Sequence, residues 1–292
     1  MNDFENAIEI SGLTKKYDGF TLNDVSFNVP KGSIMGFIGQ NGAGKTTTIK
    51  AILNIIKADS GTINIFGLDN TEHEYEIKEN IAAVFDELPF HESLSAKQLE
   101  RILGGIYKSW DNAKFKEYLE RFCLPEKKPF GKFSKGMKMK LQIAAALSHN
   151  AKLLIMDEAT TGLDPVVRDE ILHIFLEYLQ DENNSILMSS HITSDLEKIA
   201  DSVTFIDKGR LLLTGYKDDI IESHGVLKCS RSDYGAIDKS DIVSASISDF
   251  GVSVMVSDKN ACSKKYSGLV MDNTTLDEIM VYYVNADKKE WT

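Results

Sequence analysis

Short apolar runs alternate with amphipathic segments along most of this chain. Apolar runs bounded by turn residues are typical of buried strands, whereas apolar positions three or four residues apart predict helices. In the N-terminal part the runs follow one another closely. They predict strands at residues 8–10, 25–29, 34–38, 62–66 and 81–85, with one helix at 47–53.

The spacing becomes helical over residues 95–124 and again over 138–147. Beyond that, strands predicted at 153–156, 185–188 and 203–206 alternate with helices that follow Pro165 and Thr193. This alternation favours an α/β fold with a largely parallel sheet covered by helices. After Tyr216 the chain changes character, with a short alternating run at 252–256 and a helical segment at 275–284. We therefore predict a domain of residues 1–216 and a small C-terminal accessory α/β domain of residues 217–292.

A glycine-rich loop, Gly-Gln-Asn-Gly-Ala-Gly-Lys-Thr, lies between the strand at 34–38 and the following helix. Glycines allow the backbone to approach a phosphate closely, and backbone N–H groups at a helix N-terminus attract anions. The lysine would neutralise the β- and γ-phosphates, and the threonine hydroxyl would bind Mg²⁺. A glycine-rich hairpin would need neither the Gly-Lys-Thr ending nor the flanking strand and helix. The residues predicted to contact nucleotide here are Gly39, Asn41, Gly42, Gly44, Lys45, Thr46 and Thr47.

Two further patterns carry candidate chemistry. The strand at 153–156 ends in Asp157 and Glu158, and beside a phosphate loop the first carboxylate would reach the Mg²⁺ shell while the second orients the attacking water. Ser134 and Gly136 precede a helix, where they could present a hydroxyl and N–H groups to an anion. By itself, Ser134 is more simply an N-cap.

Charge and composition limit the class of protein. A net charge of −11 argues against a general nucleic-acid-binding surface, so no nucleic-acid partner is expected. We see no apolar run of the roughly 20 residues that span a bilayer, and the start lacks the features of a signal peptide. Cys123, Cys229 and Cys262 are scattered without metal-ligand spacing, which favours a reducing compartment. A soluble cytosolic protein is the expectation.

The order of these motifs, followed by Gly-Leu-Asp at 162–164 and Ser-His at 190–191, resembles the ATP-binding subunit of an ABC transporter over about residues 8–215. The resemblance implies a P-loop NTPase of the ABC type, with an N-terminal antiparallel β part and a helical subdomain at about 88–150. It implies that ATP and Mg²⁺ are bound, that Asp157 ligands Mg²⁺, and that Glu158 activates water. His191 resembles the histidine that contacts the γ-phosphate.

The same resemblance assigns several roles outside this cluster. Tyr17 falls where the family stacks an aromatic ring on adenine. Asp164 belongs to the loop that links the two active sites of a dimer, although Asp164-Pro165 is also a good N-cap and first-turn pair. Ser134 and Gly136 would bind the γ-phosphate held by the other subunit's phosphate loop. The family therefore implies a homodimer or heterodimer that closes around ATP and acts on a separate transmembrane permease at the inner face of the cell membrane.

Some positions depart from the usual family pattern. Asp86 aligns where a glutamine is usual, and we predict that it ligands Mg²⁺; the alternative is a solvated acidic loop that docks the membrane partner. Met137 and Ala159 resemble the branch of exporters for drugs, bacteriocins and antibiotic peptides. An ABC-type ATPase that acts outside transport, in translation or regulation, is the second reading, but such proteins usually carry two cassettes in one chain. A catalytically inactive subunit is the weakest reading, because the phosphate loop, the acidic pair and His191 are all present.

Overall fold

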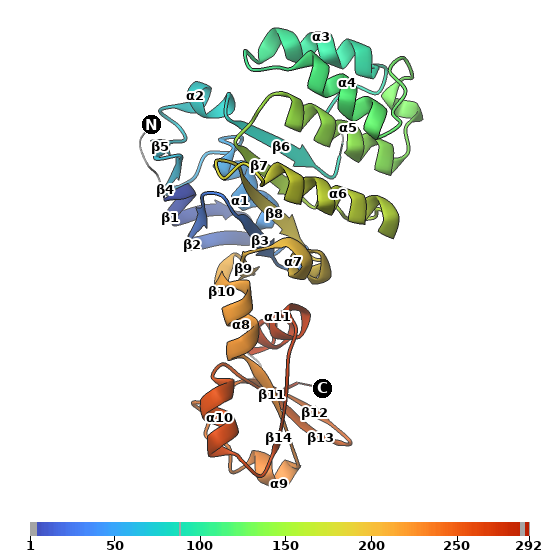
Figure 1. Cartoon of the computed structure of the whole chain (residues 1–292). Helices are drawn as coiled ribbons and strands as arrows, with labels where there is room; N and C mark the ends of the chain where they lie inside the picture. Colours follow the sequence, from blue (N-terminus) through green and yellow to red (C-terminus); the bar gives the residue numbers. More distant parts are fainter. Residues whose placement is uncertain (1–4, 88, 287–289, 292) are drawn as a thin grey trace.

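Three β-sheets organise the chain in the computed structural model, which describes residues 5–87, 89–286 and 290–291. Two sheets and the covering helices form a broad upper part in Figure 1, and the third sheet lies below them with the C-terminal helices. Among the described residues, no helix is both long and apolar enough to cross a membrane.

The first sheet is an antiparallel layer near the N-terminus with strand order β2-β1-β4-β5. Alternate side chains of the second half of β2 are buried (Val25, Phe27 and Val29), because successive residues of a strand point to opposite faces. The Phe27 ring stacks on Phe37 of the next sheet with centroids 5.2 Å apart, so the two sheets share one core. The strands are β1 (Asn6–Tyr17), β2 (Phe20–Pro30), β4 (Ser60–Ile65) and β5 (Leu68–Asp69).

The central sheet has the strand order β10-β9-β3-β8-β7-β6, and only β10 runs antiparallel to its neighbour. Every residue of β3 and β7 is buried, as expected for parallel strands covered on both faces. The parallel strands end at one edge of the sheet, where the phosphate loop and the acidic pair lie. The strands are β3 (Ile34–Ile38), β6 (Ile81–Phe85), β7 (Leu153–Asp157), β8 (Ser185–Ser190), β9 (Ser202–Asp207) and β10 (Arg210–Tyr216).

Helices cover this sheet and form a separate layer beside it, seen in green at the upper right of Figure 1. The helical stretch predicted at 95–124 is two helices, because the first ends at Ile106 and Asp111 caps the second by accepting from the N–H groups of Ala113 and Lys114. The helices are α1 (Lys45–Ile52), α2 (Glu74–Lys78), α3 (Ala96–Ile106), α4 (Asn112–Arg121), α5 (Lys135–Ser148), α6 (Pro165–Tyr178) and α7 (Thr193–Ile199), with a 3-10 turn at Phe130–Lys132.

The C-terminal part contains the third sheet, with strand order β14-β11-β13-β12-β15. It has its own core around Leu227 and Val254, but Leu276 and Ile279 belong to the large core that includes Leu196 of α7. The predicted boundary at 216/217 coincides with the end of β10 and stays a prediction. The elements are α8 (Lys217–Ser223), β11 (Gly225–Cys229), α9 (Arg231–Tyr234), β12 (Ile242–Ser248), β13 (Gly251–Val256), α10 (Lys259–Lys265), β14 (Val270–Asp272), α11 (Leu276–Val284) and β15 (Glu290–Trp291).

Candidate nucleotide-binding site

The phosphate loop leaves the end of β3 and leads directly into α1. A Cβ on Gly39 would stand 2.4 Å from the carbonyl oxygen of Ile206, so no larger residue fits there. Gly44, just before the helix, has a φ of 118°, a conformation that L side chains rarely adopt. The first N–H groups of α1 therefore emerge from a backbone that only glycine can form, which suits close approach of a phosphate.

Lys45 has almost no exposed surface, and its ammonium has three oxygen partners. Its Nζ donates to the carbonyl oxygens of Gly39 at 2.7 Å and Gln40 at 3.2 Å. The third partner is Oε1 of Glu158, at 3.0 Å. An ammonium shared in this way is fully compensated within the protein, so a triphosphate must displace some of these oxygens to bind it.

Asp157 is the last residue of β7, and its side chain is buried. In the parallel register it lies opposite Ser189 of β8, whose Oγ donates to Oδ1 at 2.7 Å. The backbone N–H of Glu158 donates to the same Ser189 hydroxyl at 3.1 Å. Ser189 thus orients both acidic residues. We did not identify it from the sequence, although its place beside the Ser-His pair was a signal.

Glu158 follows the strand with a φ of 55°, in the left-handed region that non-glycine residues seldom occupy. Its Oε2 accepts from Thr161 Oγ1 at 2.7 Å and is 2.6 Å from Nδ1 of His191. Burial alone raises the pKa of this carboxyl, but the hydrogen bond from Thr161 and the ion pair with Lys45 outweigh it, so the net pKa is lowered. Glu158 is therefore held ionised. Thr161 is a second site residue that the sequence analysis missed.

His191 lies in the short connection between β8 and α7, and its ring is partly exposed. The fold therefore brings Lys45, Asp157, Glu158 and His191 together from separate segments. The arrangement places an ammonium, an ionised carboxylate and an imidazole side by side at the phosphate loop. Such a cluster can neutralise phosphate charge and orient or deprotonate a water molecule.

Other predicted residues lie at helix starts. Ser134 caps α5, accepting from the Met137 N–H at 3.2 Å, and Gly136 lies in the first turn. Asp164 caps α6 in the same way, accepting from the Val167 N–H at 3.0 Å. The simpler N-cap role considered from the sequence is therefore present at both positions, and it leaves the exposed Ser134 available at the surface.

Tyr17 ends β1 and has a half-exposed ring. It pairs across the hairpin with Phe20, whose ring tip lies 3.2 Å from where a Cβ on Gly44 would stand. The hairpin end is thus next to the phosphate loop, as stacking of Tyr17 on adenine would require.

The remaining predicted residues lie in and just after the phosphate loop. Thr46, in the first turn of α1, is exposed, and Thr47 is partly exposed. Asn41 and Gly42 are exposed in the loop.

Asp86 has an unexpected partner. Its Oδ1 is 2.5 Å from Nζ of Lys135, the residue between Ser134 and Gly136. The neighbouring Phe85 exchanges two backbone hydrogen bonds with the side chain of Gln142 on α5, at 3.0 and 3.2 Å. Both contacts join α5 to the end of β6. Over the described ranges 5–87, 89–286 and 290–291, no three His, Cys, Asp or Glu residues are grouped to hold a metal ion.

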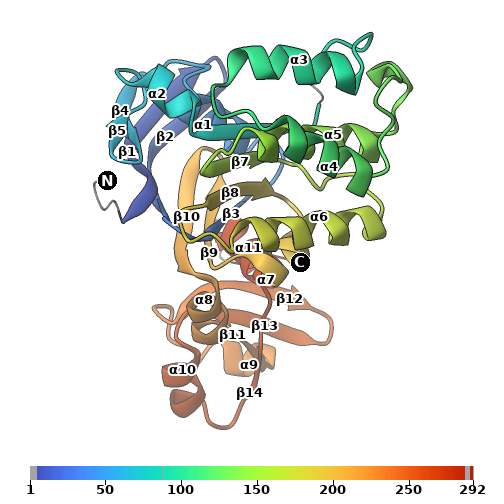
Figure 2. The same cartoon turned by 45° about the horizontal axis from the view of Figure 1, so that its top comes forward.

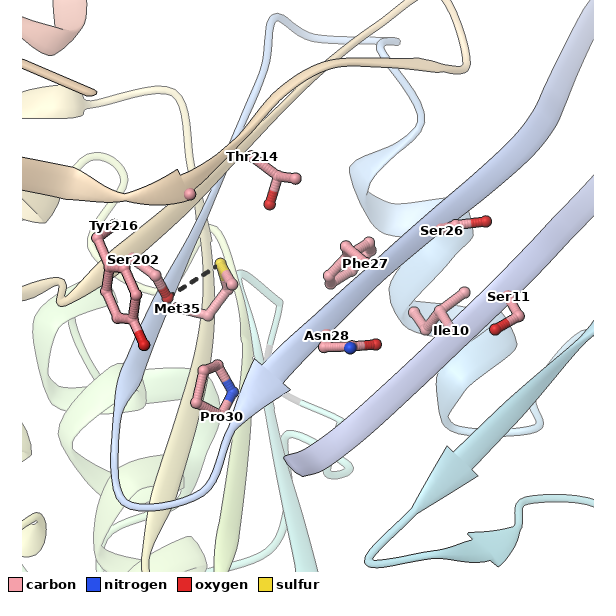
Figure 3. A pocket seen from close by; sticks show the side chains of 11 residues that line it. Ile10, Ser11, Ser26, Phe27, Asn28, Pro30, Met35, Ser202, Thr214 and Tyr216 are labelled. Carbon is pink, nitrogen blue, oxygen red and sulfur yellow. Dashed lines mark hydrogen bonds between the residues drawn. The ribbon is translucent and has the colours of Figure 1, made fainter. Parts of the chain in front are cut away.

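A cavity of about 460 Å³ lies elsewhere, between the first sheet and the β9–β10 pair (Figure 3). Its one drawn hydrogen bond runs from Ser202 Oγ to Met35 Sδ at 3.5 Å. None of the predicted site residues lines it. The lining residues are Ile10, Ser11, Ser26, Phe27, Asn28, Pro30, Met35, Ser202, Thr214, Gly215 and Tyr216.

Comparison with known proteins agrees with this geometry. The family model described as ABC transporter matches residues 22–161. The ABC transporter ATP-binding protein YtrB of Bacillus subtilis is 34% identical over 218 residues, covering 74% of each chain. The bacitracin transport ATP-binding protein BcrA of Bacillus licheniformis is 40% identical over 211 residues, covering 70% of this chain and 68% of BcrA. A solved ATP-binding subunit of an ABC transporter superposes with a TM-score of 0.68 at 30% identity, covering 74% of this chain and 92% of that one.

The chain therefore belongs to the ABC transporter family, as one of its ATP-binding subunits. The predicted P-loop NTPase fold of the ABC type and the predicted ATPase activity are confirmed. Proteins of this family bind nucleotide, so nucleotide binding follows from family membership. The individual roles of the site residues remain predictions.

The pKa shift of Glu158 predicts how acid affects stability. Because the pKa is lower in the folded than in the unfolded protein, ionised Glu158 stabilises the fold above its ordinary pKa of 4.5, and this contribution is lost as pH falls through the folded value. The difference in unfolding free energy between wild type and Glu158→Gln should shrink as pH falls below 4.5. Denaturant titrations from pH 7 to pH 3 measure it. A difference that stays constant or grows over that range would contradict the assignment.

Proposed function

We propose that this chain is the ATP-hydrolysing motor of an export system, closing around ATP as a dimer and driving a separate transmembrane partner. The observation that carries the proposal is the joint contact of Glu158 with Lys45 and His191 at the end of the phosphate loop. These groups come from separate segments, and they are the groups that phosphoryl transfer to water needs.

In this proposal, each side chain has a defined task in hydrolysis. Lys45 exchanges carbonyl and carboxylate oxygens for the β- and γ-phosphates. Glu158, ionised and oriented by Thr161, accepts a hydrogen bond from the attacking water and then its proton. His191 contacts the γ-phosphate from the loop after β8. The adenine stacks on Tyr17, whose ring is half exposed.

Magnesium would be held by Thr46, Asp157 and Asp86. The buried Asp157 carboxylate fits this role because it is fixed by Ser189 and borders the phosphate loop. Mg²⁺ usually keeps several waters and takes one or two carboxylates plus substrate phosphates, so a dense cage of protein ligands is not needed. When bound, the ion neutralises charge on the phosphate oxygens.

The site is proposed to be completed by a second subunit. Ser134 and Gly136 at the start of α5 would offer a hydroxyl and helix N–H groups to the γ-phosphate held by the partner's phosphate loop. Asp164 would lie in the loop between the two sites. ATP would then hold the two subunits together and hydrolysis would release them, whether the partner is a second copy or a related chain.

The transport role is carried over from the relatives. BcrA is named for bacitracin transport, and the SrtF proteins of Streptococcus pyogenes, 34% identical over 209 residues, are named for lantibiotic transport. Export of an antibiotic peptide through a permease at the inner face of the membrane is the proposal that fits these names. None of the relatives named here points to a role outside transport.

Replacing Glu158 tests the hydrolytic step. Glu158→Gln should still bind ATP but lower kcat about 10²–10⁴-fold, the usual effect of losing a general base. It should also accumulate a closed dimer, visible by size-exclusion chromatography with ATP. Glu182→Gln, an acid in a distant exposed loop, is the matched control. Turnover equal to wild type in Glu158→Gln would remove Glu158 from the mechanism.

Adding bulk at Ser134 tests the composite site. Ser134→Arg should leave ATP affinity of the monomer within about twofold, because the phosphate loop lies in the same chain, and should abolish ATP-dependent dimerisation. Ser134→Ala is the comparison without added bulk: it removes the hydroxyl, and with it both the proposed phosphate contact and the cap, which is typically worth about 1 kcal/mol. Equal loss of monomer binding in Ser134→Arg would show that Ser134 belongs to its own chain's pocket.

Magnesium titration of the ATPase tests Asp86. If Asp86 ligands Mg²⁺, Asp86→Asn should raise the magnesium midpoint about 10-fold, in the range of altered metal shells. Lys135→Met should lower it, because the carboxylate no longer has a competing ammonium. Glu87→Gln, the adjacent acid, is the control. If wild type and the three variants share one magnesium midpoint, Asp86 is not a magnesium ligand. The alternative, an acidic loop that docks the membrane partner, would then hold.

A further inference from the structure

We infer that residues 217–292 position the catalytic loop of their own chain: α11 holds α7, the helix that follows His191, and Glu197 is the positioning residue that joins them. The inference rests on the proposed role of His191 in hydrolysis. It gives a task to a C-terminal part whose role the sequence left open.

A polar contact at the start of α11 makes the first link. Oε1 of Glu197 on α7 accepts from the backbone N–H of Leu276 at 2.7 Å. Leu276 is the first residue of α11, and the first N–H groups of a helix have no partner within it. A carboxylate there also faces the positive end of the helix dipole. Glu197 thus completes α11 from a different part of the chain.

Further contacts fix the position of α7 relative to α11. Thr193 Oγ1, at the start of α7, donates to Oδ1 of Asp277 at 3.3 Å. Leu196 and Ile199 of α7 pack in one buried cluster with Leu276 and Ile279 of α11. In Figures 1 and 2 the two helices lie together at the junction between the upper and lower parts. Polar contacts set the position and apolar burial holds it.

A second segment of the C-terminal part also reaches α7. Nζ of Lys217, the first residue of α8, donates to the carbonyl oxygen of Glu197 at 2.8 Å. The seven-residue α7 is too short to be stable alone, so its place depends on what packs against it. Part of that packing comes from α11, beyond residue 216, and part from α6 and β3.

The link to catalysis is the short connection that carries His191. At one end Ser190 belongs to β8 and is fixed in the central sheet; at the other, Thr193 begins α7. His191 is the first of the two residues in this connection, and its Nδ1 is 2.6 Å from Oε2 of Glu158. The central sheet holds the start of this connection, and α7, supported by α11, holds its end. Weakening the contact between α11 and α7 would therefore let the His191 side chain move away from Glu158. Misplacement of a reacting group by about 1 Å can cost about 10²-fold in rate.

Two substitutions of Glu197 separate positioning from general stability. Glu197→Ala removes the acceptor and should lower kcat about 10-fold, with KM for ATP within about twofold, because the phosphate loop lies on other elements. Glu197→Gln keeps an oxygen that can accept from Leu276, so its kcat should stay within about twofold of wild type.

Two control variants change charges on α7 and in the C-terminal part without removing the hydrogen bond between Glu197 and Leu276. Lys198→Gln changes a charge on the same helix without contacting α11, and its ion pair is with Asp169. Lys265→Gln disturbs the C-terminal part away from α7, breaking the ion pairs with Asp238 and Asp241. Both should retain wild-type kcat.

A readout independent of hydrolysis is the imidazole resonance of His191 in nucleotide-free protein, assigned with His191→Asn. It should shift or broaden in Glu197→Ala and match wild type in Glu197→Gln and both controls. An unmoved resonance and unchanged kcat in Glu197→Ala, or equal losses in Glu197→Gln, would overturn the inference. If Glu197→Ala does not fold, Thr193→Val removes the hydrogen bond to Asp277 instead. A shifted His191 resonance in Thr193→Val then supports the inference, and an unmoved one overturns it. Wild type without ATPase activity would overturn the proposed function instead, while the resonance still reports on the contact.

Discussion

The ion pair between Lys45 and Glu158 is the interaction on which the site depends. Both side chains are largely withdrawn from water, and a buried ion pair is tolerated only when further hydrogen bonds satisfy its partners. The carbonyl oxygens of Gly39 and Gln40 do so for the ammonium, and Thr161 does so for the carboxylate. Removing one partner from such a pair typically costs about 3–5 kcal/mol. The loop, the acidic strand end and the histidine connection are therefore fixed relative to one another by charge as well as by packing.

Strand register decides which groups can join that pair. Because β7 and β8 run parallel and Asp157 lies opposite Ser189, one hydroxyl can reach both Asp157 and the N–H of Glu158. The same sheet places Phe85 beside Asp157, so Asp86 leaves the sheet near the acidic pair. A shift of register by one residue would turn each of these side chains to the other face. The sheet thus orients groups that are more than a hundred residues apart in the chain.

Elements outside the sheet contact the site through the helices on either side. On one side, Lys135 and Gln142 join α5 to the end of β6. The Asp86–Lys135 pair is partly exposed, and exposed pairs are weak enough to exchange partners. On the other side, α11 joins α7 through buried apolar residues, a contact that does not exchange so readily. In the mechanism proposed here, the ion pair between Asp86 and Lys135 can exchange partners, whereas the contact of α11 with α7 is a fixed support.

From the sequence alone, the alternation of strands and helices predicted the α/β fold and the glycine loop predicted nucleotide binding, because these are local patterns that allow few other structures. The order of the motifs, through its resemblance to ABC ATP-binding subunits, supplied the ABC type and the ATPase activity. The sequence also located Lys45, Glu158 and His191. It could not reveal Ser189 or Thr161 as their partners, the pairing of Asp86 with Lys135, or the capping of α11 by Glu197. Each of those contacts joins residues by strand register, helix packing or backbone conformation. Only the folded chain brings such residues within hydrogen-bonding distance, so only the tertiary structure could decide them.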